Sequence, residues 1–428
     1  MMKNKNSIEA KSLRYLDLFA GAGGLSEGFM RAGFSPVSHV EVDEAACYTL
    51  KTRLAYKWLE ENERPEIYQS YIEGEISRHE LYNTVSNKLL ESVINCEISE
   101  SSIENIFERV DELLRGYDLD VIIGGPPCQA YSLVGRARDK KKMLGDKRNY
   151  LYILYAEFLK RYKPKYFVFE NVLGLLSAKD KNEELHFNKM RKLFRECGYT
   201  TEFRILNAAD FGVLQNRKRV ILIGKYGEHE NFYPKIKAEK CKHTVQEIFC
   251  DLPTLKSGEG ICRPIKTLSY QGVYLFEAGI KKMNQQKVTF HSARPNTDHD
   301  LEIYRIAVEM WNSKNKRLCY TDLPKALQTQ KNTTSFLDRF KVVAGDLPYS
   351  QTVVAHISKD GHYFIHPDIV QNRSLTPREV ARLQTFPDDY YFESVSGKPS
   401  RTAAYKQIGN AVPVLLAEKI AKALLEVW

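Results

Sequence analysis

Short apolar runs, separated by polar and glycine-rich turns, recur along the first half of the chain. They lie at residues 14–19, 35–40, 120–123, 166–172 and 220–223. These runs are rich in β-branched and aromatic residues and are short enough to be buried strands. A helix is expected at residues 101–115, directly before the run at 120. Strands that alternate with helices predict an α/β fold with a doubly wound, mostly parallel sheet.

The first predicted strand ends in a glycine-rich turn, Phe19-Ala-Gly-Ala-Gly-Gly-Leu25. Glycine allows such a turn to pass close to a ligand. The spacing does not complete the dinucleotide fingerprint, because Ser26 stands where a third glycine is needed. The second strand is followed by Glu41, and an acidic residue there can hold ribose hydroxyls. We therefore expect a nucleoside-containing ligand at this edge of the sheet.

A single cysteine follows another predicted strand, in Gly124-Gly-Pro-Pro-Cys-Gln129. The Gly-Gly-Pro-Pro segment ends the strand and presents Cys128 on a stiff loop, where open α/β sheets bind ligands. A free cysteine is often only a small buried hydrophobe, but a thiol in this place can act as a nucleophile. Glu170, at the end of a buried strand, and the pair Arg217 and Arg219 favour the functional interpretation.

In this order, the segments resemble the cytosine-C5 DNA methyltransferase family. That family has a Phe-x-Gly-x-Gly cofactor segment, a Pro-Cys-Gln loop, a Glu-Asn-Val strand and a Gln-x-Arg-x-Arg segment. Two later stretches, Arg373–Pro387 and Gln407–Pro413, are similar to its last two blocks. The resemblance covers residues 14–225 and 373–428. It implies a Rossmann-like domain that uses S-adenosyl-L-methionine (AdoMet) to methylate C5 of cytosine.

The resemblance also implies roles for single residues. The catalytic set is Cys128, Glu170, Arg217 and Arg219. In it Cys128 attacks C6 of the base, Glu170 in its protonated form stabilises charge at N3, and Arg219 holds O2. The implied cofactor-binding residues are Phe19, Ala20, Gly21, Gly23, Gly24, Leu25, Glu41, Val42, Glu97, Ile98, Gly125, Pro127, Leu151 and Asn410.

One cofactor ligand is ambiguous from the sequence. The family's acidic residue after strand three could be Glu97 or Glu75. We prefer Glu97, because the helix expected at 101–115 then fills the interval before the next strand. The surrounding stretch, residues 56–100, is highly charged and is expected to be helical. It is an additional segment compared with the simplest arrangement of the family's blocks.

The charge of the chain suits a polyanionic partner. There are 63 Lys and Arg against 54 Asp and Glu, a net charge of +9. The loop after the cysteine is rich in Lys, Arg and glycine, and it could close over a phosphate backbone or be a solvated surface loop. The residues expected to contact double-stranded DNA are Gln129, Ser132, Arg136, Arg138 and Arg148. The target base must be flipped out, because its C6 and N3 are inaccessible in a stacked pair.

The order of the blocks predicts one domain inserted into another. The expected parts are residues 1–225, the first catalytic part; 226–398, a small target-recognition domain that includes Arg373–Pro387; and 399–428, the return to the catalytic domain. Candidates for base reading in the inserted domain are His291–Arg294, Thr329–Ser335 and Asp338–Lys341, although most protein–DNA hydrogen bonds go to the backbone.

Eight cysteines with no Cys-x-x-Cys pair predict reduced thiols. The spacing of Cys241, His243, Cys250 and Cys262 matches no common zinc pattern, so we expect no metal. Neither a membrane-spanning run nor a signal-peptide core is present in the sequence. We expect a cytoplasmic, monomeric enzyme of a prokaryote or phage, with a separate cognate restriction endonuclease as a candidate partner.

Two other functions share part of this sequence pattern. A tRNA-methylating branch of the family shares the catalytic blocks but has a different variable region. A DNA-binding pseudoenzyme is disfavoured, because Cys128, Glu170, Arg219 and Asn410 are all intact.

Overall fold

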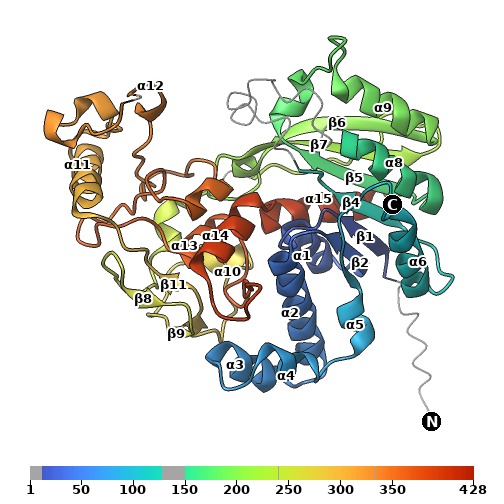
Figure 1. Cartoon of the computed structure of the whole chain (residues 1–428), viewed down its shortest axis with the longest axis horizontal. Helices are drawn as coiled ribbons and strands as arrows, with labels where there is room; N and C mark the ends of the chain where they lie inside the picture. Colours follow the sequence, from blue (N-terminus) through green and yellow to red (C-terminus); the bar gives the residue numbers. More distant parts are fainter. Residues whose placement is uncertain (1–11, 128–149, 240, 332) are drawn as a thin grey trace.

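A seven-stranded sheet forms the centre of the larger part of the molecule (Figure 1). The computed structural model describes residues 12–127, 150–239, 241–331 and 333–428. The strands are β1 (Arg14–Leu18), β2 (Ser35–Glu41), β3 (Val93–Asn95), β4 (Val121–Gly124), β5 (Tyr166–Asn171), β6 (Tyr199–Asn207) and β7 (Lys218–Tyr226).

The strand order is β3-β2-β1-β4-β5-β7-β6, and only β7 runs against its two neighbours. The predicted doubly wound, mostly parallel α/β sheet is therefore confirmed. The chain moves from β1 to one side of the sheet and later returns to β4 on the other side. The carboxyl ends of β1 and β4 thus form a topological switch point, where such sheets bind ligands.

Helices cover both faces of the sheet (Figure 1). Helices α1 (Gly24–Arg31) and α15 (Val414–Glu426) pack on one face, and α6 (Ile103–Leu114), α8 (Leu151–Tyr162) and α9 (His186–Glu196) pack on the other. Side chains alternate between the two faces, so Tyr166 and Val168 of β5 enter one core while Phe167 and Phe169 enter the other. Burial on both faces explains the continuous apolar strands of the sequence.

The charged stretch at residues 56–100 is mostly helical. It contains the end of α2 (Glu44–Glu61), α3 (Pro65–Glu73), α4 (Arg78–Tyr82), α5 (Asn87–Glu91) and β3. Local signals divide it: Gly74 ends α3 with a φ of 82°, and Ser77 starts α4 with a capping box completed by Glu80. The helix expected at 101–115 is α6.

The segment between β7 and the C-terminal helices contains mostly short elements. Its strands are β8 (Gly260–Ile261), β9 (Ile265–Lys266), β10 (Lys287–Val288) and β11 (His291–Ser292). Its helices are α10 (Tyr274–Glu277), α11 (Asp298–Lys314), α12 (Thr333–Phe336), α13 (Pro377–Leu383) and α14 (Arg401–Asn410). Short 3-10 helices of the chain are η3 (Leu173–Ser177), η4 (Ala208–Asp210), η5 (Val245–Ile248), η6 (Tyr320–Asp322), η7 (Lys325–Leu327) and η8 (Ala355–Ser358).

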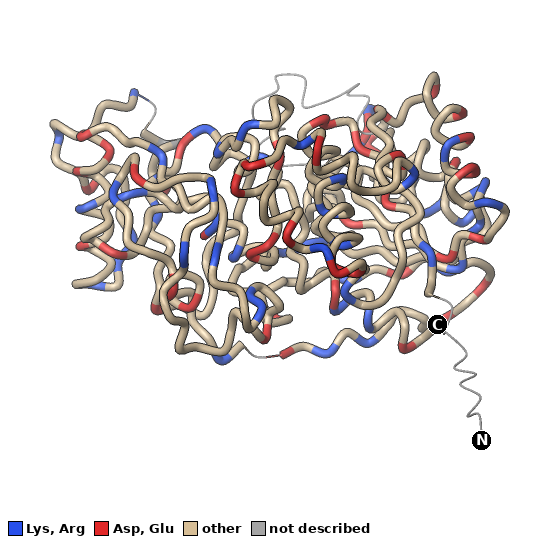
Figure 2. The backbone as a smooth tube through the Cα atoms, turned by 90° about the horizontal axis from the view of Figure 1, so that it is seen from below, with Lys and Arg blue, Asp and Glu red and all other residues tan. Residues whose placement is uncertain are grey.

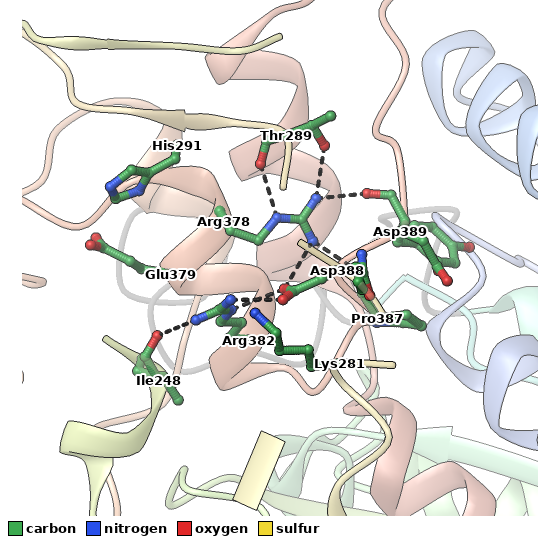
Figure 3. A network of polar contacts seen from close by, with 12 residues as sticks. Ile248, Lys281, Thr289, His291, Arg378, Glu379, Arg382, Pro387, Asp388 and Asp389 are labelled. Atoms are coloured by element: carbon green, nitrogen blue, oxygen red, sulfur yellow. Dashed lines mark hydrogen bonds and ion pairs between the residues drawn. The ribbon is translucent and has the colours of Figure 1, made fainter. Parts of the chain in front are cut away.

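Two arginines of α13 join this segment to the residues that follow α13 (Figure 3). Arg378 donates to the carbonyl and hydroxyl oxygens of Thr289, both at 2.9 Å. Arg382 binds the carboxylates of Asp251 and Asp388, with its shortest contacts at 2.6 and 2.7 Å. The block around α13 is therefore packed against residues 251 and 289 by buried charged groups.

Candidate active site

The glycine turn after β1 closes on the carboxylate that ends β2. Glu41 Oε2 accepts a hydrogen bond from the N–H of Gly21 at 2.7 Å, and its Oε1 accepts from the N–H groups of Val42 and Asp43 at 2.9 and 2.8 Å. Gly21 and Gly23 have φ values of 54° and 78°, a region that favours glycine. Burial raises the pKa of Glu41, while the N–H donors oppose that rise. The turn and Glu41 therefore form one unit.

The other residues of the turn differ in exposure. Phe19 has a positive φ of 57° and is partly buried, whereas Leu25 lies in the core. The N–H of Ala20 donates to the carbonyl of Val40 at 3.2 Å and so continues the pairing of β1 with β2. Val42 exposes 59 % of its surface. An exposed apolar residue at this strand end could cover a planar ligand.

Small residues bring the C-terminal segment against the start of α1. A Cβ atom on Gly24 would lie 2.4 Å from the carbonyl oxygen of Val412, and a Cβ atom on Gly28 would lie 2.4 Å from Cβ of Ala417. Asn410, the last residue of α14, is exposed and precedes this contact by two residues. The structure thus brings Asn410 near the glycine turn, although the two are distant in sequence.

Glu97 and Ile98 follow β3 and so reach the same edge of the sheet. Asn95 of β3 pairs with Glu41 of β2. Glu97 is exposed and Ile98 is buried. Glu75 instead follows α3 and does not end a strand. Of the two acidic candidates, Glu97 is the one at the carboxyl edge.

The ends of β4 and β5 approach each other closely at a glycine. A Cβ atom on Gly125 would lie 2.7 Å from both the carbonyl oxygen and Oε2 of Glu170. The side-chain amide of Asn171 donates to the carbonyl of Pro126 at 3.2 Å. Pro127, the last described residue of this loop, is exposed. Residues 125–127 are therefore fixed against the end of β5.

Glu170 and Arg219 form an ion pair between β5 and β7. Arg219 Nε lies 2.8 Å from Glu170 Oε1, and the two side chains are 12 % and 14 % exposed. Arg217 is more deeply buried, and its guanidinium donates to the carbonyls of Val353 and Ala411 at 2.5 and 2.9 Å. Of the two arginines predicted to be catalytic, Arg219 contacts the predicted acid, and Arg217 binds the backbone of other segments.

Several predicted site residues lie outside the described residues. They are Cys128, Gln129, Ser132, Arg136, Arg138 and Arg148. The described chain resumes just before α8, whose first residue, Leu151, is partly buried. The described site thus consists of the carboxyl ends of β1 to β5, Leu151, Arg219 at the start of β7, and Asn410.

Asp17 of β1 is a buried carboxyl that sequence analysis did not single out. It is 1 % exposed, and its Oδ2 has no hydrogen-bond partner among the described residues. Burial and then the charge of Glu41 raise the pKa of Asp17 well above its ordinary value. An acidic residue inside an apolar strand was the available signal, because it is costly unless it is paired or functional.

The residues of this edge fit a cofactor that carries a nucleoside. An ionised carboxylate has about four acceptor sites, and the three backbone donors leave one on Glu41 for a ribose hydroxyl. No atom lies within 4 Å of a Cβ built on Gly21, so the turn has open space beside it. Val42 supplies exposed apolar surface for a base.

In the backbone tube, Lys and Arg positions and Asp and Glu positions are both distributed over the described chain (Figure 2). His291 is fully buried and contacts Thr376 and the carbonyl of Pro253, while Arg294 donates to the carbonyl of Ile357. These two candidates for base reading therefore stabilise the fold. The segment 329–331 is exposed.

Among the described residues, no group of three or more His, Cys, Asp or Glu side chains could hold a metal ion. Within the same ranges, the helices are too short or too polar to cross a membrane.

Comparisons with known proteins identify the family. The model of the C-5 cytosine-specific DNA methylase family matches residues 13–81 and 72–426. The Type II methyltransferase M.Bpa9945I of Bacillus paralicheniformis is 40 % identical, with 96 % of this chain and 98 % of that protein covered. M.DdeI of Desulfomicrobium norvegicum, also a Type II methyltransferase, is 30 % identical, with 96 % and 88 % covered.

Solved structures agree on the fold. A putative DNA modification methyltransferase encoded within an E. coli prophage has a TM-score of 0.60 at 21 % identity, with 97 % of this chain and 99 % of that chain covered. The Entamoeba histolytica methyltransferase EhMeth has a TM-score of 0.53 at 15 % identity, with 97 % and 98 % covered. The chain thus has the Rossmann-like methyltransferase fold, belongs to the C-5 cytosine-specific DNA methylase family and is a DNA (cytosine-5-)-methyltransferase.

Proposed function

We propose that this enzyme methylates C5 of a flipped-out cytosine within a specific double-stranded DNA sequence and takes the methyl group from AdoMet. The observation that carries the proposal is the Glu170–Arg219 ion pair beside Gly125. Only β4 separates β5, which carries Glu170, from β1 and its glycine turn. Groups suited to a pyrimidine and groups suited to a nucleoside cofactor therefore lie on neighbouring strand ends.

The chemistry begins with activation of the ring. C5 of cytosine is too electron-poor to accept a methyl cation equivalent, so a nucleophile must first add at C6. Cys128, the residue after Pro127 in the sequence, is the candidate nucleophile. Its thiolate sulfur bonds to C6, and a ring electron pair moves toward N3 and O2. Glu170 in its protonated form donates to N3, and Arg219 donates to O2.

The adduct makes C5 nucleophilic. When bound, AdoMet supplies the methyl group. A base then removes the proton from C5, the electron pair re-forms the C5–C6 double bond, and the Cys128 sulfur leaves as a thiolate. The Cys128 thiolate is therefore regenerated after one methylation.

Arg219 and Arg217 have different proposed roles. Arg219 binds Oε1 of Glu170, which leaves Oε2 available to the base. Arg217 acts as a positioning residue, because it ties the start of β7 to the carbonyls of Val353 and Ala411. Loss of either arginine would disturb the Glu170 carboxyl, directly or through β7.

The proposed cofactor site joins six parts of the chain. The turn Phe19–Leu25 would surround the methionine part, Glu41 would accept from the ribose, and Val42, Glu97 and Ile98 would contact the adenine. Gly125, Pro127, Leu151 and Asn410 complete the proposed set. Support comes from the open acceptor site on Glu41 and the exposed surface of Val42.

DNA contacts are proposed on both sides of the site. Gln129, Ser132, Arg136, Arg138 and Arg148 would contact the duplex near the flipped base. Residues 226–398 would read the sequence, while 1–225 and 399–428 would perform the chemistry. We further propose that the enzyme acts as a cytoplasmic monomer beside a separate restriction endonuclease, by analogy with Type II relatives.

Two assays test the proposal. Purified enzyme with labelled AdoMet should methylate plasmid DNA and not total tRNA. A duplex with 5-fluorocytosine at the target should trap the enzyme covalently, because no C5 proton can leave. Cys128→Ser should lose methyl transfer and trapping but keep AdoMet binding, since a hydroxyl is the poorer nucleophile. Full activity of the serine variant, or activity on tRNA alone, would refute it.

A further inference from the structure

A small cavity lies inside the distal lobe, which we define as residues 298–365. Figure 1 shows this lobe, with α11 and α12, at the end of the molecule opposite the sheet. It has its own core, which includes Ile303, Tyr320, Phe340 and Ile365. The cavity measures about 140 Å³, several times the ~30 Å³ share of a water molecule in the liquid. It can therefore hold a planar group of several heavy atoms.

Aromatic rings form one wall of the cavity. Tyr320 and Phe340 are nearly parallel, with an interplanar angle of 15° and centroids 6.1 Å apart. Phe336 adds a third ring, 5.7 Å from Tyr320. Such rings are platforms on which a flat, polarisable group can stack.

The cavity lining also contains two buried nitrogens whose hydrogen-bonding capacity is unused. His299 Nε2 and Arg339 Nε have no partner among the described residues. The other end of Arg339 is held, because its Nη2 lies 2.7 Å from Nε2 of His356 and also binds Asp360. A buried polar atom without a partner is costly, so a ligand that bonded to both nitrogens would remove that cost.

The charge of the lining excludes a phosphate group. Asp300 and Asp360 both line the cavity, against the single guanidinium of Arg339. Burial lowers the pKa of His362, although Asp360 and Asp300 oppose that change, so this ring is neutral at neutral pH. An anion would meet more negative than positive charge. A neutral ring that both donates and accepts hydrogen bonds suits these groups better.

Two residues of a candidate DNA-reading segment belong to the lining of the cavity. Thr329 and Gln330 line the cavity and are exposed to solvent. We propose that the cavity receives a nucleobase displaced from the substrate duplex, in addition to the cytosine that enters the catalytic site. An exocyclic amine of that base would donate to a carboxylate, and its ring nitrogen or carbonyl would accept from Arg339 or His299. This inference rests on the proposed DNA substrate.

The proposed displacement of a second base can be tested by 2-aminopurine fluorescence. Once bisulfite sequencing has mapped the recognition sequence, 2-aminopurine is placed at each position except the target cytosine. Binding of the wild-type enzyme should brighten one such position, because an unstacked 2-aminopurine fluoresces strongly. Gln330→Trp would place a large side chain at the cavity, and His299→Phe removes the unpartnered nitrogen. Each substitution should abolish that signal and weaken binding of the cognate duplex about tenfold.

Controls separate the lobe's stability from its binding. Arg305→Ala removes an exposed charge of α11 outside the cavity lining and should behave like the wild type. All three variants should unfold at the wild-type temperature.

Three results would overturn the inference: no brightening at any non-target position, brightening that persists in both cavity variants, or tight binding of a free nucleoside without DNA. That last titration, with adenosine, guanosine and cytidine, distinguishes a small-molecule site from a duplex base. The proposed function is judged separately, by methylation of plasmid DNA by the wild type.

Discussion

Arg219 and Arg382 are both bound by carboxylates, but they differ in burial and in how many of their N–H groups already have acceptors. All five N–H groups of Arg382 have acceptors, on Asp388, Asp251 and the carbonyl of Ile248. Among the described residues, the contacts recorded for Arg219 are with Glu170 and the carbonyl of Lys218. Arg382 is fully buried, and Arg219 keeps 12 % exposure.

The number of unused guanidinium donors distinguishes an ion pair that stabilises packing from one that is suited to bind a ligand. A guanidinium whose donors are all used stabilises the packing of segments and has nothing left to offer a ligand. A guanidinium with unused donors at a strand end can bind a substrate and hold its partner carboxylate in place. The predictions below test this contrast between the Arg382 cluster and the Glu170–Arg219 pair.

The largest effect is expected from Glu170→Gln. The amide cannot supply the carboxylic proton when charge develops on the ring, so the rate of methyl transfer should fall about a thousandfold. DNA and AdoMet affinities should stay near those of the wild type. Single-turnover kinetics and DNA titrations measure the two quantities. If the loss appeared only in DNA binding, Glu170 would be a positioning residue.

Arg382→Met and Arg219→Met sharpen the comparison directly. Among the described residues, Arg382→Met leaves Asp251 with Lys281 as its only charged partner and Asp388 with Arg378, 3.8 Å away. The loss of one buried guanidinium between two carboxylates should lower the free energy of unfolding by about 3 kcal/mol. The Arg219–Glu170 pair is 12 % and 14 % exposed, so Arg219→Met should lower that free energy by less than Arg382→Met does, yet slow methyl transfer. Urea unfolding followed by circular dichroism checks both variants. If the two substitutions lowered the free energy of unfolding equally, the proposed difference between a structural Arg382 and a ligand-binding Arg219 would be wrong.

Short-range patterns predicted much of the sheet. Apolar runs located β1, β2, β4, β5 and β7, because strands buried on both faces of a sheet are continuously apolar in sequence. Strand β6 was not predicted, since it lies at the sheet edge and several of its residues are partly or fully exposed. Its mixture of Thr, Glu and Arg gives no buried-strand signal.

The partners of the site residues were much less predictable. Arg217 and Arg219 look equivalent in the sequence, but Arg217 is bound by the carbonyls of Val353 and Ala411, far along the chain. The burial of His291 likewise depends on Thr376 and Pro253. Such roles are set by tertiary contacts, which a local pattern does not contain.

A pH experiment extends the contrast to Glu27, which belongs to the structural class. Burial alone would raise the pKa of Glu27, but the ion pair with Arg53, aided by Lys57 and Arg31, lowers it to about 2. A carboxyl with a depressed folded-state pKa stabilises the fold above its unfolded value of about 4.3. That stabilisation is lost as the pH falls from there toward 2.

Glu27→Gln should therefore cost about 3 kcal/mol of unfolding free energy at pH 7. The difference from the wild type should shrink as the pH falls below about 4.3. Urea unfolding at pH 7, 4 and 3 measures it, with Glu44→Gln, at an exposed position of α2, as the control. A difference that stayed constant with pH would contradict the assigned ion pair.

The smallest effect is expected from Gly125→Ala. The new Cβ would lie 2.7 Å from both Oε2 and the backbone carbonyl oxygen of Glu170, so the side chain and the strand end must both shift. Misplacement of a catalytic group by a fraction of an ångström should slow methyl transfer about thirtyfold. The backbone contact should also lower the free energy of unfolding, so urea unfolding is measured beside the rate. An unchanged rate would show that Glu170 Oε2 is not the oxygen that meets the base.

The contact between Gly28 and Ala417 has a consequence for biosynthesis. The helix that follows the glycine turn is covered by α15, which is made about 390 residues later. At ~5–20 residues per second, the ribosome needs roughly 20 to 85 s to reach residue 424. Until then α1 lacks its apolar cover, and the nascent chain cannot complete the proposed cofactor site. Binding of AdoMet is therefore expected only after α15 has been made.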